Sequence, residues 1–181
     1  MLAFDAPGHG DSPGEELSVP SLARILTEIA ASEGPWHAGI GHSMGAAAVA
    51  SAADAWAGAG VAMRGLVLLA PPQSQLERLE RVAARLELTP DVQAEFFAAV
   101  VRRTGAAFDE ADLRVVARRA PCPVCVFHDP ADEDASFEKA QEVVGLWRGA
   151  RLVPCPGRGH YRILATPEIV RQAVEFIAGL R

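Results

Sequence analysis

Short segments that are apolar throughout alternate with longer amphipathic segments along the 181-residue chain, and this alternation constrains the fold more than any other feature. Residues 66–70 and 124–127 are apolar at every position, so the strands that they predict must be buried on both faces. Such strands are typical of parallel sheets that carry helices on both sides. The sequence therefore predicts an α/β fold with a mostly parallel sheet.

The other segments continue this alternation. Helices are expected where apolar residues recur every three or four positions and where proline or glycine marks an end. The predicted strands are residues 1–4, 36–40, 66–70, 124–127 and 151–153, and the predicted helices are residues 20–33, 46–59, 137–147 and 166–179. A single domain, residues 1–181, accommodates them all, because a chain of this length is too short for two ordinary domains.

Residues 72–120 interrupt the alternation, because they carry only helical patterns. Their first helix has one apolar stripe, a second helix begins at Pro90, and Asp109 is expected to cap a third. The stripe consists of Leu76, Leu79, Val82 and Leu86. The segment is predicted to be a helical insertion between two strands of the sheet.

The composition excludes several classes of protein. The net charge is −6 and the basic residues form no long run, so a nucleic-acid-binding surface is not expected. No apolar run approaches the roughly 20 residues of a membrane span. Residues 1–20 lack the basic and apolar regions of a signal peptide, which makes the expected location cytoplasmic. Cys122 and Cys125 are predicted to be core thiols on opposite faces of a strand, and no metal ion or organic cofactor is expected.

A G-x-S-x-G pentapeptide, residues 41–45, lies between a predicted strand and a predicted helix. This is the setting of a nucleophile elbow, a sharp turn that strains the central serine and requires small neighbours. The pentapeptide alone is equally compatible with an ordinary glycine-rich helix start, in which Ser43 would only cap the helix. Ser43 is therefore a candidate nucleophile that needs supporting residues elsewhere.

Candidate supporting residues follow two later strands. A serine hydroxyl needs a base, and an imidazole base needs a carboxylate that orients it. His160 follows the strand at 151–153, and Asp129, Asp132 and Asp134 follow the strand at 124–127. Because the carboxyl ends of parallel strands meet at one edge of a sheet, these side chains are expected to lie near the pentapeptide.

The chain resembles the α/β-hydrolase superfamily, in its esterase and lipase-like branch, over essentially its whole length. The likeness rests on the family's D-x-P-G-H-G-x-S loop at residues 5–12, the elbow, the acid loop at residues 128–132 and the Gly159-His160 pair. The motifs occur in the family's order, with serine before aspartate before histidine. Asp129 departs from the H-G-x-x-D pattern of the acid loop, because it stands in place of glycine. The resemblance also implies that residues 72–120 form a lid.

The resemblance implies a catalytic triad in which Ser43 is the nucleophile, His160 the general base and Asp132 the orienting acid. Asp129 or Asp134 could replace Asp132, and Glu133 is a weaker alternative. The backbone N–H of Met44 is implied as one oxyanion donor. The expected activity is hydrolysis of a small-molecule carboxylic ester or thioester without a metal or cofactor. Perhydrolase and C–C bond hydrolase chemistry use the same triad.

Four other residues are expected to have supporting roles. His42 is adjacent to the serine, so its side chain should diverge from it and pack or line the pocket. His128 is predicted to brace the acid loop, and His9 to stay outside the catalytic group, at most rimming the pocket. Asp5 is expected to accept backbone hydrogen bonds within its own loop.

The family's usual strands before residues 1–4, and its H-G loop that supplies a second oxyanion N–H, have no counterpart in this sequence. The one H-G pair before the elbow, His9-Gly10, belongs to the later loop. Three explanations are open: a longer true protein, which the intact motifs favour, a degenerate fragment, or a whole chain that uses another N–H. The alternative function is an impaired hydrolase fragment or a non-catalytic binding module.

Overall fold

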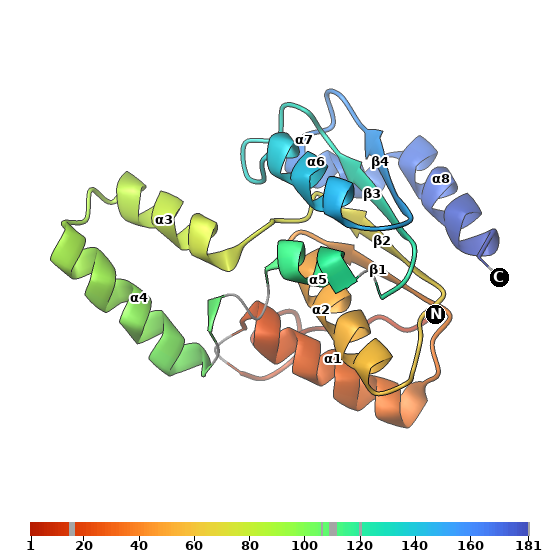
Figure 1. Ribbon diagram of the computed structural model, residues 1–181, viewed down its shortest axis with the longest axis horizontal. Coiled ribbons are helices and arrows are strands. Elements are labelled where there is room, and N and C mark those ends of the chain that lie inside the picture. The colour runs from red at the N-terminus through yellow and green to blue at the C-terminus, as the bar shows by residue number, and fades with distance from the viewer. Residues whose placement is uncertain (15–16, 106, 109–111, 120, 181) are drawn as a thin grey trace.

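The computed structural model describes residues 1–14, 17–105, 107–108, 112–119 and 121–180. In these residues, four strands form one sheet in which every neighbouring pair is parallel (Figure 1). The strands are β1 (Ala38–His42), β2 (Gly65–Leu69), β3 (Val124–His128) and β4 (Ala150–Pro154), and they lie side by side in chain order. The predicted α/β fold with a parallel sheet is confirmed, and these four strands lie close to their expected positions.

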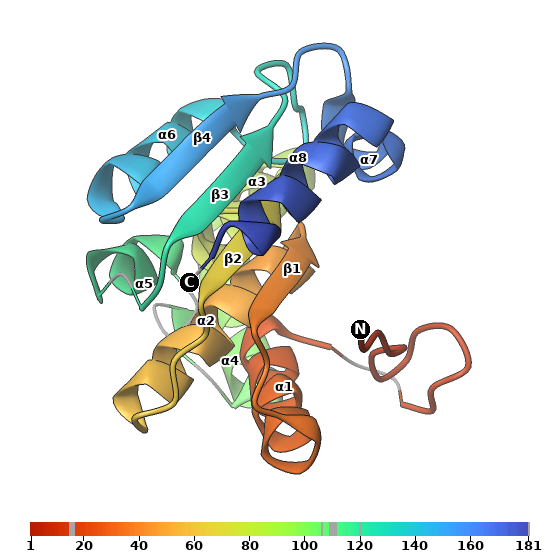
Figure 2. The same cartoon turned by 90° about the vertical axis from the view of Figure 1, so that its right-hand side faces the viewer.

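Helices cover both faces of the sheet (Figure 2). One side carries α1 (Val19–Glu33), α2 (Met44–Gly58), α5 (Leu113–Arg119) and α6 (Phe137–Leu146), and the other carries α8 (Pro167–Ala178). Leu66 and Leu68 of β2 belong to the first core, whereas Val67 and Leu69 belong to the second. Both faces are therefore buried, which explains why this strand is apolar throughout. None of the helices in the described ranges is long and apolar enough to cross a membrane.

The cysteines are buried free thiols, as expected. Cys122 belongs to the core on the α2 side of the sheet and Cys125 to the core on the α8 side. Burial raises the pKa of each of these two thiols to about 11, so neither is a thiolate at neutral pH.

Residues 72–120 contain α3 (Gln75–Arg85), α4 (Pro90–Thr104) and α5, and these helices pack differently. Figure 1 shows α3 and α4 extending away from the sheet, whereas α5 lies against α2 and α6. Leu113 and Val116 of α5 are buried in the core on the α2 side. The expected cap residue Asp109 lies outside the described residues. The part of this segment that stands apart from the sheet is thus α3 and α4.

Residues 1–4 do not form the predicted strand. Leu2 and Phe4 are 52% and 40% exposed. A groove of about 930 Å³ is lined both by this segment and by residues 38–40 of β1, and Figure 2 shows the segment beyond the β1 edge of the sheet. A strand requires a neighbour that pairs with its backbone N–H and C=O groups. Within the described residues β1 pairs only with β2, so the apolar pattern at residues 1–4 is not sufficient for a strand.

Candidate active site

The candidate residues lie at the carboxyl ends of three strands, where the sheet topology is expected to gather them. Ser43 follows β1, Asp132 follows β3, and His160 follows β4 in the short helix α7 (Gly159–Arg162). They come from parts of the chain up to 117 residues apart. The parallel order of the strands brings these three loops to one edge of the sheet.

Ser43 occupies a strained turn between β1 and α2. Its backbone dihedrals are φ 49° and ψ −124°, a positive φ that costs a residue other than glycine about 1–3 kcal/mol. The Ser43 N–H donates to the carbonyl oxygen of Leu69, 2.9 Å away, which anchors the turn to β2. The strained elbow expected from the pentapeptide is therefore present.

The two glycines of the elbow differ in how much space surrounds them. A Cβ on Gly41 would lie 2.5 Å from the carbonyl oxygen of Gly45 and 2.6 Å from the Cα of Ala46. A Cβ on Gly45 would meet nothing within 4 Å. The expected need for small neighbours on both sides of the serine holds for Gly41 and is wrong for Gly45, because the second position faces open space.

We expect Gly41→Ala to lower the free energy of unfolding by about 1–3 kcal/mol, because the backbone of α2 must move to admit the methyl group. Gly45→Ala is the matched control, and its methyl group enters free space at the start of a helix. It should leave the stability unchanged or raise it by up to about 1 kcal/mol. Urea denaturation measures both values. An equal loss in the two variants would contradict the tight contact at Gly41.

His160 connects Ser43 to Asp132 by two hydrogen bonds. Its Nε2 lies 2.9 Å from the Ser43 Oγ, and its Nδ1 lies 2.9 Å from the Asp132 Oδ2. With the ring proton assigned to Nδ1, the imidazole donates to the carboxylate and accepts from the serine hydroxyl. The side chain of His160 is 7% exposed and that of Asp132 is fully buried. This arrangement can remove the serine proton and stabilise the imidazolium that forms.

The three aspartates that follow β3, Asp129, Asp132 and Asp134, make different contacts. The Asp132 Oδ1 accepts hydrogen bonds from the N–H groups of Asp134 and Ala135, which leaves its Oδ2 for His160. Asp129 instead accepts hydrogen bonds from Ala131 and Gly159. Asp134 is exposed. Of these three candidates, Asp132 is the one whose carboxylate is hydrogen-bonded to His160.

Asp129 joins the acid loop to the histidine loop. Burial raises the pKa of its carboxyl group, but the backbone N–H groups of Gly159, Ala131 and Arg158 outweigh burial, so the pKa lies below its ordinary value. Gly159 is the residue that precedes His160 in the chain, so its hydrogen bond to Asp129 ties the histidine loop to the acid loop. This role was missed by the sequence reasoning, and the replacement of the family's glycine by Asp129 was the signal for it.

His128 braces the acid loop, as expected. Its Nε2 donates to the carbonyl oxygen of Ala135, 2.9 Å away, and lies 3.5 Å from the Asp132 Oδ2. Its side chain is completely buried, and burial is the largest cause that lowers its pKa below 6.5. The hydrogen bond to Ala135 and the negative charge of Asp132 oppose this shift without overcoming it.

We expect the stability of the protein to fall as the pH drops below about 6.5, because buried His128 resists protonation in the folded chain. The unfolded chain binds more protons in this range, so the free energy of unfolding decreases by up to about 1.4 kcal/mol per pH unit for this group. Urea denaturation between pH 5 and 7.5 measures the slope. His128→Gln should flatten the slope, whereas His37→Gln, an exposed control, should not. Identical slopes for the parent and His128→Gln would contradict the assignment.

His42 contacts the histidine loop. Its Nε2 donates to the backbone carbonyl oxygen of His160, 2.8 Å away, and the two ring centroids are 4.8 Å apart. Burial is the largest cause that lowers the pKa of His42, and the hydrogen bond to His160 opposes this shift. The tie of this side chain to His160 was not foreseen, because it joins residues 118 positions apart.

The remaining loop residues have modest roles. Asp5 accepts a hydrogen bond from the N–H of Asp11, as expected for its own loop. Among the described residues, Asp132, Asp134 and His160 could offer three metal ligands within 4.8 Å of one another. A cation bound there would compete with the hydrogen bond between Asp132 and His160.

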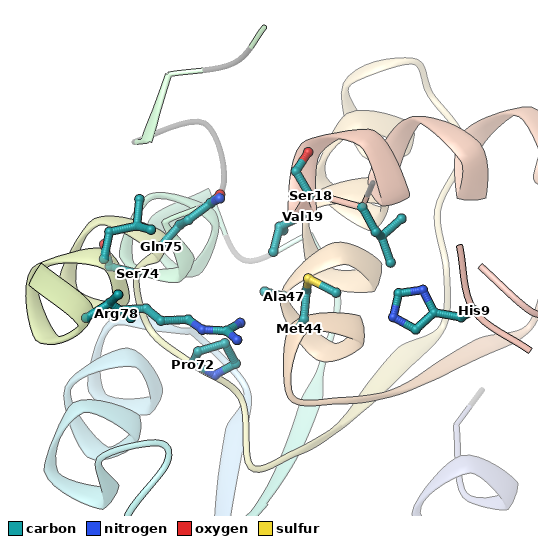
Figure 3. A pocket seen from close by; sticks show the side chains of 12 residues that line it. His9, Ser18, Val19, Met44, Ala47, Pro72, Ser74, Gln75 and Arg78 are labelled. Atoms are coloured by element: carbon teal, nitrogen blue, oxygen red, sulfur yellow. The ribbon is translucent and has the colours of Figure 1, made fainter. Parts of the chain in front are cut away.

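A pocket of about 410 Å³ lies beside the start of α2 (Figure 3). Met44 and Ala47 of α2 form part of its wall, and His9 lies at one side of it. Met44 is the first residue of α2, so its N–H has no acceptor within the helix and is free for a ligand oxygen. Leu79 and Val82 of the apolar stripe on α3 complete the opposite side.

Comparisons with known proteins agree with this fold. Residues 1–173 match the profile of the alpha/beta hydrolase family. No curated protein sequence matches the chain. Monoacylglycerol lipase of Paleococcus ferrophilus superposes with a TM-score of 0.67 at 20% identity, covering 97% of this chain and 80% of the lipase.

Two further solved structures are similar. An esterase from Exiguobacterium antarcticum gives a TM-score of 0.67 at 14% identity, covering 95% of this chain and 79% of the esterase. A putative lipase of Acinetobacter baumannii gives 0.65 at 19% identity, covering 95% and 72%. Identities this low show a shared fold only, whereas the family profile covers nearly the whole sequence. The chain belongs to the alpha/beta hydrolase family.

Proposed function

We propose that this protein hydrolyses carboxylic esters or thioesters through a covalent acyl-enzyme on Ser43. The observation that carries the proposal is the unbroken hydrogen-bonded series from Ser43 through His160 to Asp132, with the serine on a strained elbow. Membership of the alpha/beta hydrolase family supports hydrolysis as the reaction class. The esterase and lipases with the same fold make an ester the substrate class to test first.

The proposed mechanism uses each group in a defined order. The Ser43 Oγ attacks the carbonyl carbon while the His160 Nε2 takes its proton, and Asp132 stabilises the resulting imidazolium. The Met44 N–H donates to the oxygen that becomes negatively charged. The imidazolium gives its proton to the leaving alcohol or thiol as the carbon–oxygen or carbon–sulfur bond breaks. Water, deprotonated by His160, then releases the acid and restores the serine.

The pocket beside Met44 is not lined by Ser43, His160 or Asp132 themselves. Because Met44 directly follows Ser43 in the chain, we infer that one arm of the ester lies in this pocket. Met44, Leu79 and Val82 present apolar side chains, which suits a moderately hydrophobic part of the ester. Because two of these residues belong to α3, we infer that the helical segment 72–120 acts as a lid through α3 and α4. This placement is consistent with helices that stand apart from the sheet.

The test of this function is the intact mass of the folded protein after incubation with a fluorophosphonate. One adduct on the parent and none on Ser43→Ala is the expected result, because only an activated serine reacts readily with this reagent. Circular dichroism first establishes that both proteins are folded. A folded parent without an adduct would overturn the proposal and favour a non-catalytic binding role.

His42→Ala is expected to lower kcat about 10-fold with little change in KM, because the His160 backbone loses the donor that holds it. The conservative variant His42→Gln retains a side-chain N–H donor and should restore part of the rate. Steady-state kinetics with a p-nitrophenyl ester separates kcat from KM. A change confined to KM, or no rescue by glutamine, would argue against this positioning role.

A further inference from the structure

The pocket beside Met44 contains a charged side chain that the proposed mechanism does not use. Arg78 extends its guanidinium from α3 into the pocket, towards Ala47 and Met44 (Figure 3). No aspartate or glutamate of the described residues lines this pocket, although the whole chain has a net charge of −6. Arg78 is exposed, and the described part of the pocket wall offers it no carboxylate.

The neighbouring charged side chains of α3 have partners elsewhere. Glu77 lies 3.7 Å from Arg114 and 3.5 Å from Lys139. Arg81 donates to the carbonyl oxygen of Asp134, 3.0 Å away. Within the described part of the chain, no ion pair or side-chain hydrogen bond engages the Arg78 guanidinium. An arginine that reaches over apolar side chains without a carboxylate partner is suited to bind an anion from outside the protein.

We propose that the preferred substrate is an ester that carries a second, free carboxylate, and that Arg78 binds this carboxylate; the inference rests on the proposed ester hydrolysis. The planar guanidinium offers two parallel N–H groups that match the two carboxylate oxygens. No lysine or second arginine lines the pocket in the described chain, so one carboxylate charge is a better match than a phosphate dianion. Val19, Leu79 and Val82 contact the apolar stem between the ester and the carboxylate.

The kinetic test compares charged and neutral esters of equal length. The probes are p-nitrophenyl monoesters of C4–C8 dicarboxylic acids, their p-nitrophenyl alkanoate counterparts, and acetate esters of hydroxy acids, which place the carboxylate on the alcohol arm. Arg78→Ala should lower the ratio of kcat/KM for charged over neutral esters about 10–100-fold. Arg78→Lys should retain part of this ratio, because lysine keeps the positive charge but not the planar guanidinium. Added salt should lower the ratio in the parent, because it screens the attraction between the two charges.

Arg85→Ala is the matched control, because Arg85 lies on the same helix and does not line the pocket. Its ratio should equal that of the parent. If the ratio of kcat/KM for charged over neutral esters is the same in the parent and in Arg78→Ala, the inference is overturned. The proposed ester hydrolysis would still stand in that case. Failure of the proposed function itself would appear differently, as a parent that hydrolyses none of the esters.

A binding measurement tests the site without turnover. Titration calorimetry with monomethyl esters of the same dicarboxylic acids uses the Ser43→Ala protein, with and without Arg78→Ala. The expected result is a Kd about 10–100-fold weaker without the guanidinium, and no such difference for neutral dimethyl esters. Equal affinities in the two proteins would overturn the inference whatever the catalytic outcome.

Discussion

Ser43→Ala is expected to lower kcat for ester hydrolysis about 10⁴–10⁶-fold, because alanine cannot form the acyl-enzyme. The residual rate is expected to come from the proposed oxyanion donor, the Met44 N–H, and from substrate binding. The fold should persist, since the Oγ bonds to His160 alone among the described residues and the Cβ of alanine occupies the place of the serine Cβ. Steady-state kinetics with a p-nitrophenyl ester, beside the circular dichroism spectrum, measures both effects.

Ser51→Ala is the matched control for this change. Ser51 lies on α2, like Met44, and its hydroxyl donates to the carbonyl oxygen of Ala47. Its loss should leave kcat within about 2-fold of the parent, because Ser51 is half-buried and touches neither the candidate triad nor the pocket beside Met44. Activity that survives in Ser43→Ala would remove the serine from the proposed mechanism.

Asp132→Asn is expected to lower kcat about 10⁴-fold, because an amide at this position no longer favours the ring proton on the His160 Nδ1. The amide also cannot stabilise the imidazolium by charge. KM should change little, since Asp132 is buried beneath His160 and does not line the pocket.

Asp129→Asn distinguishes the proposed orienting acid from its neighbour. Asp129 accepts from Ala131 and Gly159, and an amide can replace only one of its two oxygens. We expect the free energy of unfolding to fall by about 1–3 kcal/mol and kcat to fall much less than in Asp132→Asn. Urea denaturation and kinetics on both variants provide the comparison. A larger kcat loss in Asp129→Asn would reverse the two roles.

Much of the fold was predictable because local patterns decide local structure. Strands apolar at every position, such as 66–70, can exist only where both faces are covered, so they predicted the parallel sheet and its two cores. The pentapeptide at 41–45, together with the other motifs of the family, predicted a strained backbone at Ser43, and the structure shows it as a positive φ. The place of each motif directly after a predicted parallel strand predicted which loops would meet.

The sequence by itself therefore determined the fold class, the elbow and the set of loops that carry the candidate triad. Only the tertiary structure decided that Asp132 rather than Asp129 reaches His160, and that His42 holds the same residue. It also decided that residues 1–4 remain unpaired and that Arg78 enters the pocket. These outcomes depend on hydrogen bonds and contacts between residues far apart in the chain, and the apolar periodicity of a single segment carries no information about its distant partners.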